Sequence, residues 1–436
     1  MVKYSCERCG NDFSQKSHYD SHNRRKTPCE NNADKIKALV DKAVEEKIKE
    51  LNNKKLIVEN EKEEIINTMA EMNNKLKVIS LFTGIGGVDM GFDGEVIVHK
   101  DSIINKEFID TPSTTKDFVV LKKNNFECVF QNDILQGAKE VFGFNNDNSN
   151  YNTTSIYTLI SENFIFPEAD IVIGGFPCQD FSHAGKRNGF KSKKGHDLKE
   201  TVDIEKENSR GTLYKSFVEV VKRVKPKVFV AENVYGLLTM KNEPIKQIMT
   251  DFSELGYDVN YQVIYCPEFG IPQTRKRVII MGISKERNVD INEGWNIITK
   301  NKTECNVGKY FEHLTEPDLT DDISQMVYSK AKKLEKGQGQ TEVNLASFAP
   351  TMRAEHHGNI EYRRHANSKI NINEKTMVER RLTVREAGLI QTFPPEYVFN
   401  EKKNMVAYKY IGNAVPPLLG YLIADKVDEL CKSHFT

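Results

Sequence analysis

The chain has 436 residues, 39% of them hydrophobic, which is enough for two or three folding units with sizeable cores. Its 62 Lys and Arg residues balance 62 Asp and Glu residues, so the whole chain supplies no basic field for nucleic acid. No apolar run approaches the roughly 20 residues of a membrane span, and the first residues contain no signal-peptide core. Eight mostly scattered cysteines favour reduced thiols over a disulfide framework. These features predict a cytoplasmic protein with no membrane partner.

Residues 1–32 have the ligand spacing of a small metal-binding module. The candidate ligands are Cys6, Cys9, His22 and Cys29. Their C-x2-C-x12-H-x6-C pattern resembles a C2H2 zinc finger whose last ligand is a displaced cysteine. Thiolate and imidazole ligands suit tetrahedral Zn²⁺, and a unit this small needs a metal to fold. The alternative is a tail with unligated cysteines. Residues 24–26, Arg-Arg-Lys, are either phosphate contacts or ordinary solvated surface.

Residues 33–77 are predicted to form a helical linker. The segment is rich in Lys, Glu, Ile and Leu and contains no Gly or Pro. An apolar stripe with 4-3-4 spacing runs through Ile65, Met69, Met72 and Leu76. Three interpretations remain open: a spacer, a dimerising coiled coil, or a stripe packed on the main domain. Broken periodicity at residues 52–55 argues against a long coiled coil, so a monomer is expected, with dimerisation through this helix as the alternative.

The sequence "KVISLFTGIGG" predicts a strand that runs into a glycine-rich turn. Gly84, Gly86 and Gly87 would let backbone amides approach a nucleotide-like ligand, although such a turn is also typical of a simple strand-to-helix connection. The next strand, "FECVFQND", ends at Asp133, where a carboxylate can hold ribose hydroxyls. Together these strands favour a nucleotide-binding α/β domain.

Three further strands carry polar residues at their ends. "ADIVIGG" leads into the loop with Cys178, "KPKVFVAENV" carries Glu232, and "FGIPQTRKRVIIMGI" carries Arg275 and Arg277. Open α/β sheets bind ligands at the carboxyl ends of their strands, so this arrangement predicts a doubly wound α/β enzyme. From its position alone, Cys178 is either a small buried hydrophobe or a nucleophile on a stiff loop.

From Val78 to the carboxyl terminus, the order of motifs resembles the cytosine-5 DNA methyltransferase family. "LFTGIGG" resembles its S-adenosylmethionine loop, "GGFPCQDFS" its Pro-Cys nucleophile loop, and "SRGTLY" its next cofactor-side turn. "AENV" resembles the Glu-Asn-Val motif, "PQTRKR" the Gln-x-Arg-x-Arg motif, and "RRLTVREAGLIQTFP" and "YKYIGNAVPP" the two closing motifs. The resemblance implies a Rossmann-like catalytic domain over residues 78–282, a target-recognition domain over 283–376, and a segment over 377–436 that completes the catalytic domain.

The resemblance also implies a site for S-adenosylmethionine. In the family pattern Phe82 stacks on the adenine, Asp133 holds the ribose, and other side chains line the far side. The implied cofactor residues are Phe82, Gly84, Gly86, Gly87, Asp133, Ile134, Ser155, Leu213 and Asn413. Where the family has Gly-Asp-Ile against the adenine, this chain has "TSI", so the contact made by Ser155 is open.

For catalysis, the resemblance agrees with what the chemistry requires. Cytosine C5 is a poor nucleophile, so the Cys178 thiolate adds at C6 and makes C5 enamine-like. Protonation of N3 by Glu232 eases this addition, and Arg277, with Arg275, donates to the cytosine O2. Phosphate binding or a structural ion pair remains the alternative for both arginines.

The target atom lies inside a duplex stack, so the cytosine must be flipped into the pocket. Pro177 stiffens the loop that meets it, and Asn233 is expected to orient the catalytic cluster. Two insertions, residues 94–124 and 191–208, exceed the usual family spacing. The second insertion, rich in Lys and Glu, is either an extended DNA contact or, as we favour, solvated surface.

The recognition region carries basic and amide side chains suited to base edges and phosphates. The residues expected to contact DNA are Gln179, Ser182, Arg353, His356, His357 and Arg363. A metal site at His356 and His357 is a rival interpretation, but no cysteine lies nearby in the sequence.

The leading interpretation is a sequence-specific DNA cytosine-5 methyltransferase that acts on double-stranded DNA and protects it from a cognate restriction endonuclease. That endonuclease would be a genetic rather than a physical partner. One alternative is an RNA cytosine methyltransferase on the same scaffold. Another is an inactive regulator that binds DNA through its zinc finger.

Overall fold

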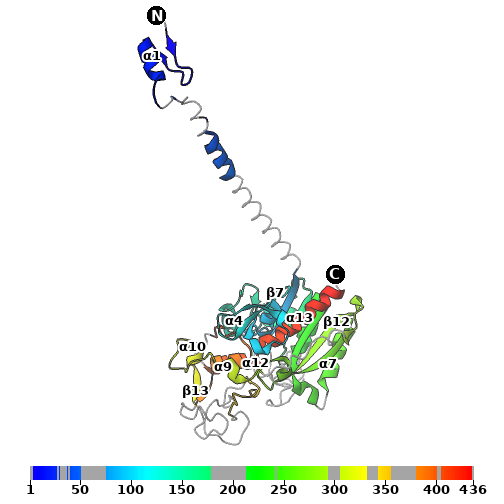
Figure 1. Cartoon of the computed structure of the whole chain (residues 1–436). Helices are drawn as coiled ribbons and strands as arrows, with labels where there is room; N and C mark the ends of the chain where they lie inside the picture. The colour runs from blue at the N-terminus through cyan, green and yellow to red at the C-terminus, as the bar shows by residue number, and fades with distance from the viewer. Residues whose placement is uncertain are drawn as a thin grey trace. The chain divides into compact units, whose positions relative to one another are not determined.

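The structure is a computed structural model of the whole chain (Figure 1). It describes residues 3–26, 29, 37, 40–50, 75–177, 213–240, 243–292, 305–330, 342–354, 380–399 and 404–434. The chain divides into two compact units, Met1–Asn74 and Lys75–Thr436, and each is considered by itself.

The first unit begins with a short hairpin and a helix. Strands β1 (Tyr4–Ser5) and β2 (Asp12–Phe13) pair antiparallel, and helix α1 (Lys16–Asn23) follows them. The rings of Phe13 and Tyr19 lie 6.2 Å apart between centroids and form part of a small aromatic core. Residues 40–50 are helical, as the linker composition predicts.

The predicted apolar helix stripe is wrong at its last member. Leu76 begins strand β3 (Leu76–Leu81) and pairs with Phe126 of the neighbouring strand. Its amide donates to the carbonyl of Asn125, so parallel strand pairing replaces the helical pattern there. The other members, Ile65, Met69 and Met72, lie outside the described residues.

A seven-stranded mixed sheet forms the centre of the second unit. Its other strands are β7 (Phe126–Asn132), β8 (Tyr151–Asn152), β9 (Ile171–Gly174), β10 (Val228–Val234), β11 (Tyr257–Tyr265) and β12 (Lys276–Ser284). The order is β11-β12-β10-β9-β3-β7-β8, and β12 runs antiparallel to both of its neighbours while the remaining pairs are parallel. This confirms the predicted doubly wound α/β fold.

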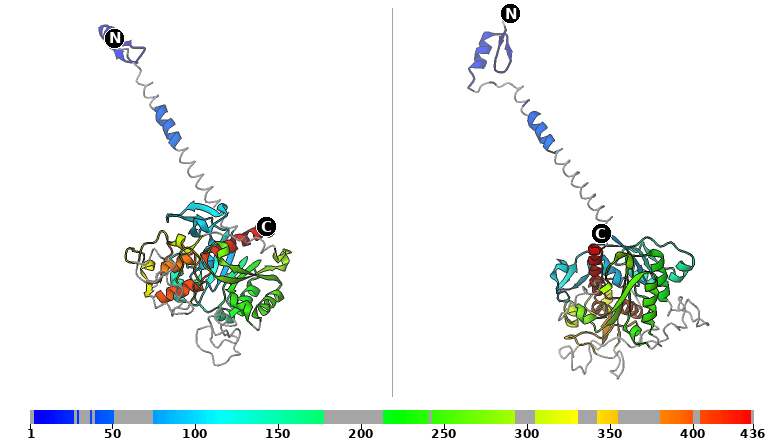
Figure 2. Two further views of the ribbon diagram at one scale, coloured as in Figure 1. Left: turned by 60° about the horizontal axis from the view of Figure 1, so that its bottom comes forward. Right: turned by 90° about the vertical axis from the view of Figure 1, so that its right-hand side faces the viewer.

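Helices cover both faces of this sheet because its strands are apolar on both sides. Val228 and Val230 of β10 face a core shared with α3 (Gly87–Asp93) and α13 (Pro417–His434). Phe229 and Ala231 face the opposite core, with α5 (Ile156–Ser161), α6 (Leu213–Val224) and α7 (Pro244–Glu254). Figure 2 shows the red helix α13 and the green helices flanking the green strands. The carboxyl-terminal helix therefore belongs to the same layered body as the first strands.

A third core joins α4 (Gln136–Gly143), α9 (Val307–Phe311), β14 (Arg380–Thr383), α11 (Val384–Ile390) and α12 (Asn404–Asn413). Beside it, α10 (Ile323–Met326) packs on α11, and β13 (Tyr328–Lys330) pairs with β14. Short 3-10 turns occupy Lys100–Ser102, Lys106–Phe108, Tyr235–Thr239, Cys266–Phe269 and Lys285–Arg287. Arg380 and Glu386 form a buried two-bond ion pair at 2.8 and 2.9 Å that fixes the start of α11. Within the described parts of the chain, no helix is both long enough and apolar enough to cross a bilayer.

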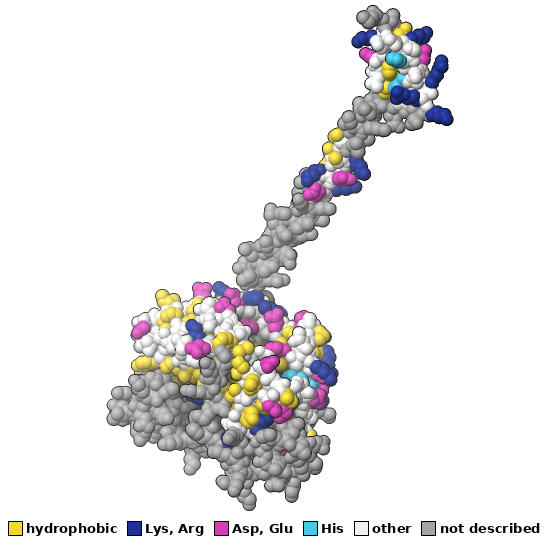
Figure 3. Space-filling view, turned by 90° about the vertical axis from the view of Figure 1, so that its left-hand side faces the viewer, with side chains coloured by type: hydrophobic (Ala, Val, Ile, Leu, Met, Phe, Trp, Pro, Cys, Tyr) yellow, Lys and Arg dark blue, Asp and Glu magenta, His cyan; other side chains and the backbone are white. Residues whose placement is uncertain are grey.

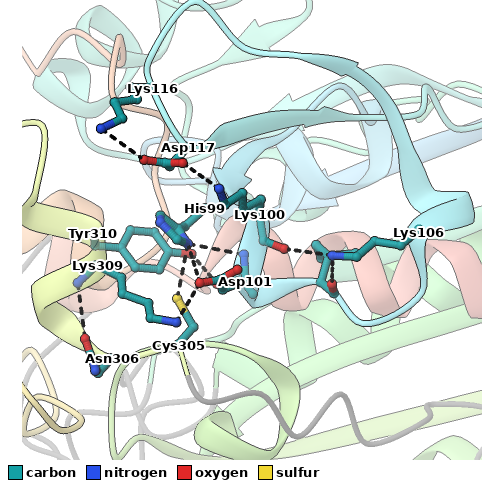
Figure 4. Close-up of polar contacts among 12 residues, drawn as sticks. His99, Lys100, Asp101, Lys106, Lys116, Asp117, Cys305, Asn306, Lys309 and Tyr310 are labelled. Atoms are coloured by element: carbon teal, nitrogen blue, oxygen red, sulfur yellow. Dashed lines mark hydrogen bonds and ion pairs between the residues drawn. The ribbon is translucent and has the colours of Figure 1, made fainter.

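The first insertion, residues 94–124, folds into its own antiparallel sheet. Strands β4 (Ile97–His99), β6 (Phe118–Leu121) and β5 (Ile109–Pro112) pair in that spatial order. Figure 4 shows its polar contacts with the segment 305–310.

Two of these contacts join side chains more than 200 residues apart in sequence. The hydroxyls of Ser102 and Tyr310 lie 2.8 Å apart, and Lys309 Nζ lies 2.6 Å from the Asp101 carboxylate. Burial also lowers the pKa of His99 and raises that of Cys305 to about 12, so both side chains are neutral at pH 7. Through the Ser102–Tyr310 and Asp101–Lys309 contacts, the insertion is joined to the segment that begins at Cys305.

Candidate active site

The strand order places a topological switch point between β3 and β9. The chain leaves β3 toward β7 on one side, and β9 and β10 lie on the other side. Open α/β sheets bind ligands outside the carboxyl ends of their strands at such a point. At the carboxyl end of β3 the chain enters the glycine-rich turn, and at the carboxyl end of β9 it enters the loop that leads to Cys178.

The glycine-rich turn has the backbone conformation that only glycine adopts easily. Gly84 and Gly86 have φ angles of 57° and 79°. A Cβ at Gly84 would meet nothing within 4 Å, so open space lies beside it. A Cβ at Gly87 would instead lie 2.2 Å from the Val415 carbonyl oxygen, because helix α3 starts against the closing motif. Phe82, just before the turn, also has a positive φ of 56°.

Asp133 lies at the end of β7 against this turn. Its carboxylate accepts the amide N–H of Gly84 at 3.0 Å and that of Leu135 at 2.9 Å. Burial raises the pKa of this carboxyl group. A carboxylate beside an open glycine turn fits the ribose of a nucleoside cofactor. Ile134, the next residue, is 40% exposed and offers an apolar surface for a base.

The other predicted cofactor residues, Ser155, Leu213 and Asn413, lie on three further elements. Asn132 donates to the carbonyls of Asn152 and Thr154 at 3.0 and 2.9 Å, and this fixes the segment that leads to Ser155. Ser155 then precedes helix α5 as its N-cap residue. Leu213 begins helix α6 and is buried, whereas Asn413 ends helix α12 and is exposed. Asn132 was not predicted from the sequence as a residue of this site. The signal that could have identified it is its position directly before Asp133.

Two adjacent residues of β10 lie against the loop before Cys178. Asn233 is fully buried, and its Nδ2 donates to the Phe176 carbonyl at 3.2 Å. A Cβ at Gly175 would lie 3.0 Å from the Glu232 Oε2, so the loop passes directly beside that carboxylate. Pro177 is the last described residue of this loop, and Cys178 itself lies outside the described residues.

Glu232 and Arg277 form a close ion pair at this strand end. The Arg277 Nε lies 2.6 Å from the Glu232 Oε1, and the two side chains are 10% and 14% exposed. Arg277 lies on β12 opposite Val234 of β10, so the antiparallel pairing of these strands brings the two charges together. The structure therefore places a carboxylate and a guanidinium side by side at this strand end.

Arg275, which was expected to assist Arg277, has different contacts. It is 1% exposed, and its guanidinium donates to three carbonyls: those of Met352 and Gly412 at 3.2 Å and that of Ala414 at 3.0 Å. These bonds hold the closing motif around Asn413 next to the segment at Met352. These contacts place the Arg275 guanidinium on the closing motif, whereas Arg277 lies beside the Glu232 carboxylate.

Two glutamines extend this network and were missed in the sequence. Gln273 is fully buried, and its Nε2 donates to the Gln391 Oε1 at 2.6 Å while its Oε1 accepts the Met352 amide at 2.8 Å. Gln391 in turn donates to the Ala414 carbonyl at 2.5 Å. Both glutamines lie in the quoted motifs "PQTRKR" and "RRLTVREAGLIQTFP", which was the signal for them.

Comparison with known proteins agrees with this geometry. Residues 76–429 match the family described as C-5 cytosine-specific DNA methylase. The chain belongs to this family. It is an S-adenosylmethionine-dependent DNA (cytosine-5-)-methyltransferase.

Among its relatives, the type II methyltransferase M.BspRI of Lysinibacillus sphaericus is 31% identical over 385 residues, covering 83% of this chain and 84% of the relative. M.BsuRI of Bacillus subtilis, also a type II methyltransferase, is 28% identical over 386 residues, covering 84% and 82%. The S. pombe Dnmt2 methyltransferase structure superposes with a TM-score of 0.53 at 18% identity, covering 82% of this chain and 99% of that one. At that identity the superposition supports the fold alone.

Most residues expected to contact DNA in this methyltransferase lie outside the described residues. These are Gln179, Ser182, His356, His357 and Arg363. Arg353 is described: its backbone packs on the closing motif, since a Cβ at Gly412 would lie 2.2 Å from the Arg353 carbonyl carbon. Arg353 is therefore adjacent to the positions that Arg275 fixes.

The amino-terminal unit gathers the four predicted metal ligands. One ligand atom from each of Cys6, Cys9, His22 and Cys29 lies within 4.8 Å of the others. Cys6 Sγ is 3.4 Å from Cys29 Sγ, and Cys9 Sγ is 3.3 Å from His22 Nε2. Tetrahedral zinc with Zn–S bonds of about 2.3 Å requires ligand atoms about 3.8 Å apart, so the residues fit this ion. A hydrogen bond from the Cys9 backbone lowers the pKa of Cys6 to about 6, and the hydrogen bond with Cys6 raises the pKa of Cys29 to about 11, so Cys6 carries the thiolate of this pair.

Proposed function

We propose that this protein is a sequence-specific type II DNA methyltransferase that modifies cytosine through a covalent Cys178 adduct at C6. The Glu232–Arg277 pair, 2.6 Å apart beside the loop that leads to Cys178, supports this mechanism most directly. The names of the relatives support the type II assignment, because M.BspRI and M.BsuRI are called type II methyltransferases. Such an enzyme would protect host DNA from a cognate restriction endonuclease.

In the proposed mechanism a cytosine flipped from duplex DNA enters beside Pro177. The Cys178 thiolate attacks C6 while Glu232 delivers a proton to N3, so the ring accepts the sulfur without accumulating negative charge. Arg277 donates to the cytosine O2 and also keeps Glu232 aimed at N3. After C5 is methylated, a base such as water takes the C5 proton, the C5–C6 double bond forms again as the Cys178 sulfur leaves C6, and N3 returns its proton to Glu232.

The residues around Asp133 would hold the cofactor. When bound, S-adenosylmethionine supplies an electrophilic methyl group on its sulfonium sulfur. Asp133 would accept the ribose hydroxyls, the open turn at Gly84 would accommodate the nucleoside, and Phe82 with Ile134 would contact the adenine. Ser155, Leu213 and Asn413 would complete the site.

The remaining parts of the chain have proposed roles of their own. Residues 283–376 would read the DNA sequence, with Arg353, His356, His357 and Arg363 among the contacts, and Gln179 and Ser182 would meet the DNA beside the flipped base. Residues 1–32 would bind one Zn²⁺ through the four gathered ligands. We expect the enzyme to act as a monomer.

Bisulfite sequencing of plasmid from cells that express the protein tests this function. Methylated cytosines should occur at one recurrent sequence and should disappear in a Cys178→Ala control. Unmodified plasmid combined with methylated cytosines in cellular RNA would contradict the DNA assignment and favour the RNA alternative. Unmodified DNA and RNA would favour the inactive regulator.

A further inference from the structure

The zinc-finger-like module, residues 3–26, differs in charge from the rest of the chain. It carries six basic residues and three acidic ones, a net charge of +3 in a chain whose net charge is +0. One of its acids, Asp12, lies 3.9 Å from Lys3 and also accepts a hydrogen bond from Ser5 at 2.5 Å. Figure 3 shows Lys and Arg side chains projecting from its surface. The module therefore supplies the local basic field that the whole chain lacks.

The ligand arrangement determines which side of helix α1 faces outward. The helix starts at Lys16, so His22 is its seventh residue, and His22 and Tyr19 pack against Phe13 with ring centroids 4.8 and 6.2 Å away. Gln15 directly precedes the helix, His18 is its third residue and Ser21 its sixth. All three side chains are exposed.

In C2H2 zinc fingers, the residues at these outward helix positions contact DNA bases. When the helix of a C2H2 finger lies in the major groove, residues −1, 3 and 6 contact three successive bases. Gln15, His18 and Ser21 occupy these positions, and each has a side chain that can hydrogen-bond to base edges. A glutamine side-chain amide can form two hydrogen bonds with adenine, and a serine hydroxyl can hydrogen-bond to any of several bases. Arg24, Arg25 and Lys26, all exposed, follow the helix as candidates for phosphate contacts.

The surface chemistry favours DNA over a protein partner. Across residues 3–26 no large apolar side chain is exposed, so the surface has no anchor of the kind that protein interfaces bury at their centres. A polar, basic surface with exposed hydrogen-bonding groups at regular helical positions fits the major groove.

We propose that the finger is a second, base-reading site for duplex DNA, separate from the recognition region of the methyltransferase unit. This inference rests on the proposed zinc site, because the metal fixes the register of α1. Residues 27–74 connect the two units in the sequence, so one duplex bound by the finger raises the effective concentration of a nearby methylation site. The finger therefore selects targets by the DNA that flanks them.

The test uses the full-length, zinc-loaded protein and a library of 40-base-pair duplexes. Each duplex carries the methylation site found by bisulfite sequencing, flanked by random sequence. Wild-type protein should enrich a second motif of about three base pairs in the flank. A Gln15→Ala/His18→Ala variant should lose this flanking motif, while an Asn11→Ala control, changed at an exposed turn residue of the hairpin, should retain it.

A second variant separates phosphate contacts from base reading. Arg24→Ala/Arg25→Ala/Lys26→Ala should weaken binding to all flanks alike. It should also reduce the slope of log K against log salt by about 2 to 3, since each phosphate contact contributes about 0.9. Binding of wild-type protein with no flanking motif would overturn the inference, as would capture of single-stranded RNA or of a protein in place of duplex DNA.

Metal analysis of the same preparations keeps this outcome distinct from failure of the zinc site. About one zinc per chain with no flanking motif would overturn the second DNA site alone. Absence of zinc from wild-type protein would overturn the metal site, and with it the register on which the inference depends. Bisulfite sequencing reports the methyltransferase activity independently of both results.

Discussion

Arg275 and Arg277 stand two residues apart, yet their contacts predict different consequences when each is replaced by lysine. Two terminal nitrogens of Arg275 reach the three carbonyls, whereas a lysine has a single nitrogen, so Arg275→Lys should lose at least one of these bonds. The loss of one or two charge-assisted bonds costs about 1.5–6 kcal/mol at about 1.5–3 kcal/mol each. At about 2 °C per kcal/mol, Arg275→Lys should lower the melting temperature by roughly 3–12 °C. Because the bonds hold the closing motif around Asn413, affinity for the cofactor should fall as well.

Arg277→Lys should show the opposite pattern. The lysine keeps a positive charge near Glu232, so the loss of stability should be about 1 kcal/mol or less. It lacks the planar donor that meets Glu232 and the cytosine O2, so the single-turnover rate should fall by about 10²- to 10³-fold. Thermal melting, calorimetry with S-adenosylhomocysteine and single-turnover methylation measure the three effects. An Arg275→Lys protein that melts like wild type, binds cofactor normally and fails only in methyl transfer would refute the positioning role.

Three further substitutions test the site, and a fourth tests its pH dependence. Cys178→Ala should abolish methyl transfer but keep cofactor binding, and an adduct formed by this variant on 5-fluorocytosine DNA would contradict the nucleophile assignment. Glu232→Gln should slow transfer by about 10²-fold or more; wild-type rates across pH would remove this acid from the mechanism. Gly175→Ala places a Cβ 3.0 Å from the Glu232 Oε2, so the single-turnover rate should fall several-fold with little change in melting temperature, and an unchanged rate would argue against a close approach. The pKa of Asp133 is raised above its ordinary value of 3.8, so cofactor affinity should be complete above the raised pKa and fall as the pH decreases through it. Calorimetry on Asp133→Asn should show weak binding without this pH dependence, and equal pH dependence in both proteins would exclude the carboxylate.

The strand ends of the active site could be predicted because their signals are local. The segment "IVIGG" before the nucleophile loop is a short β-branched run closed by glycines, and the structure confirms it as β9, Ile171–Gly174. The same holds for the strand that carries Glu232. Parallel strands bring their carboxyl ends to one edge of the sheet, so fold class predicts that Asp133, Glu232 and the loop before Cys178 lie at the same edge. Arg277 reaches this edge differently, because it lies at the amino end of the antiparallel strand β12.

The role of Arg275 could not be predicted because its partners are distant in sequence. Its acceptors at Met352 and Gly412 are backbone carbonyls 77 and 137 residues away, and a carbonyl acceptor leaves no mark in residue type. Leu76 shows the opposite case, in which a local sequence pattern was present but predicted the wrong conformation. Its spacing from Met72 satisfied a helical pattern, but pairing with Phe126 across the sheet determined its conformation. Tertiary contacts decided both cases.

The dipeptide Glu232–Asn233 shows why the nucleophile loop needs two adjacent residues of one strand. Successive side chains of a strand point to opposite faces, so one residue can serve the reaction while its neighbour serves the scaffold. Asn233, fully buried, holds the Phe176 carbonyl, and Glu232, 14% exposed, lies beside Gly175 with its charge opposite Arg277. A hydrogen bond therefore holds the loop at Phe176, and the loop passes close to the Glu232 carboxylate at the preceding residue, Gly175. We therefore expect a change at either position to move the loop before Cys178 relative to the Glu232 carboxylate.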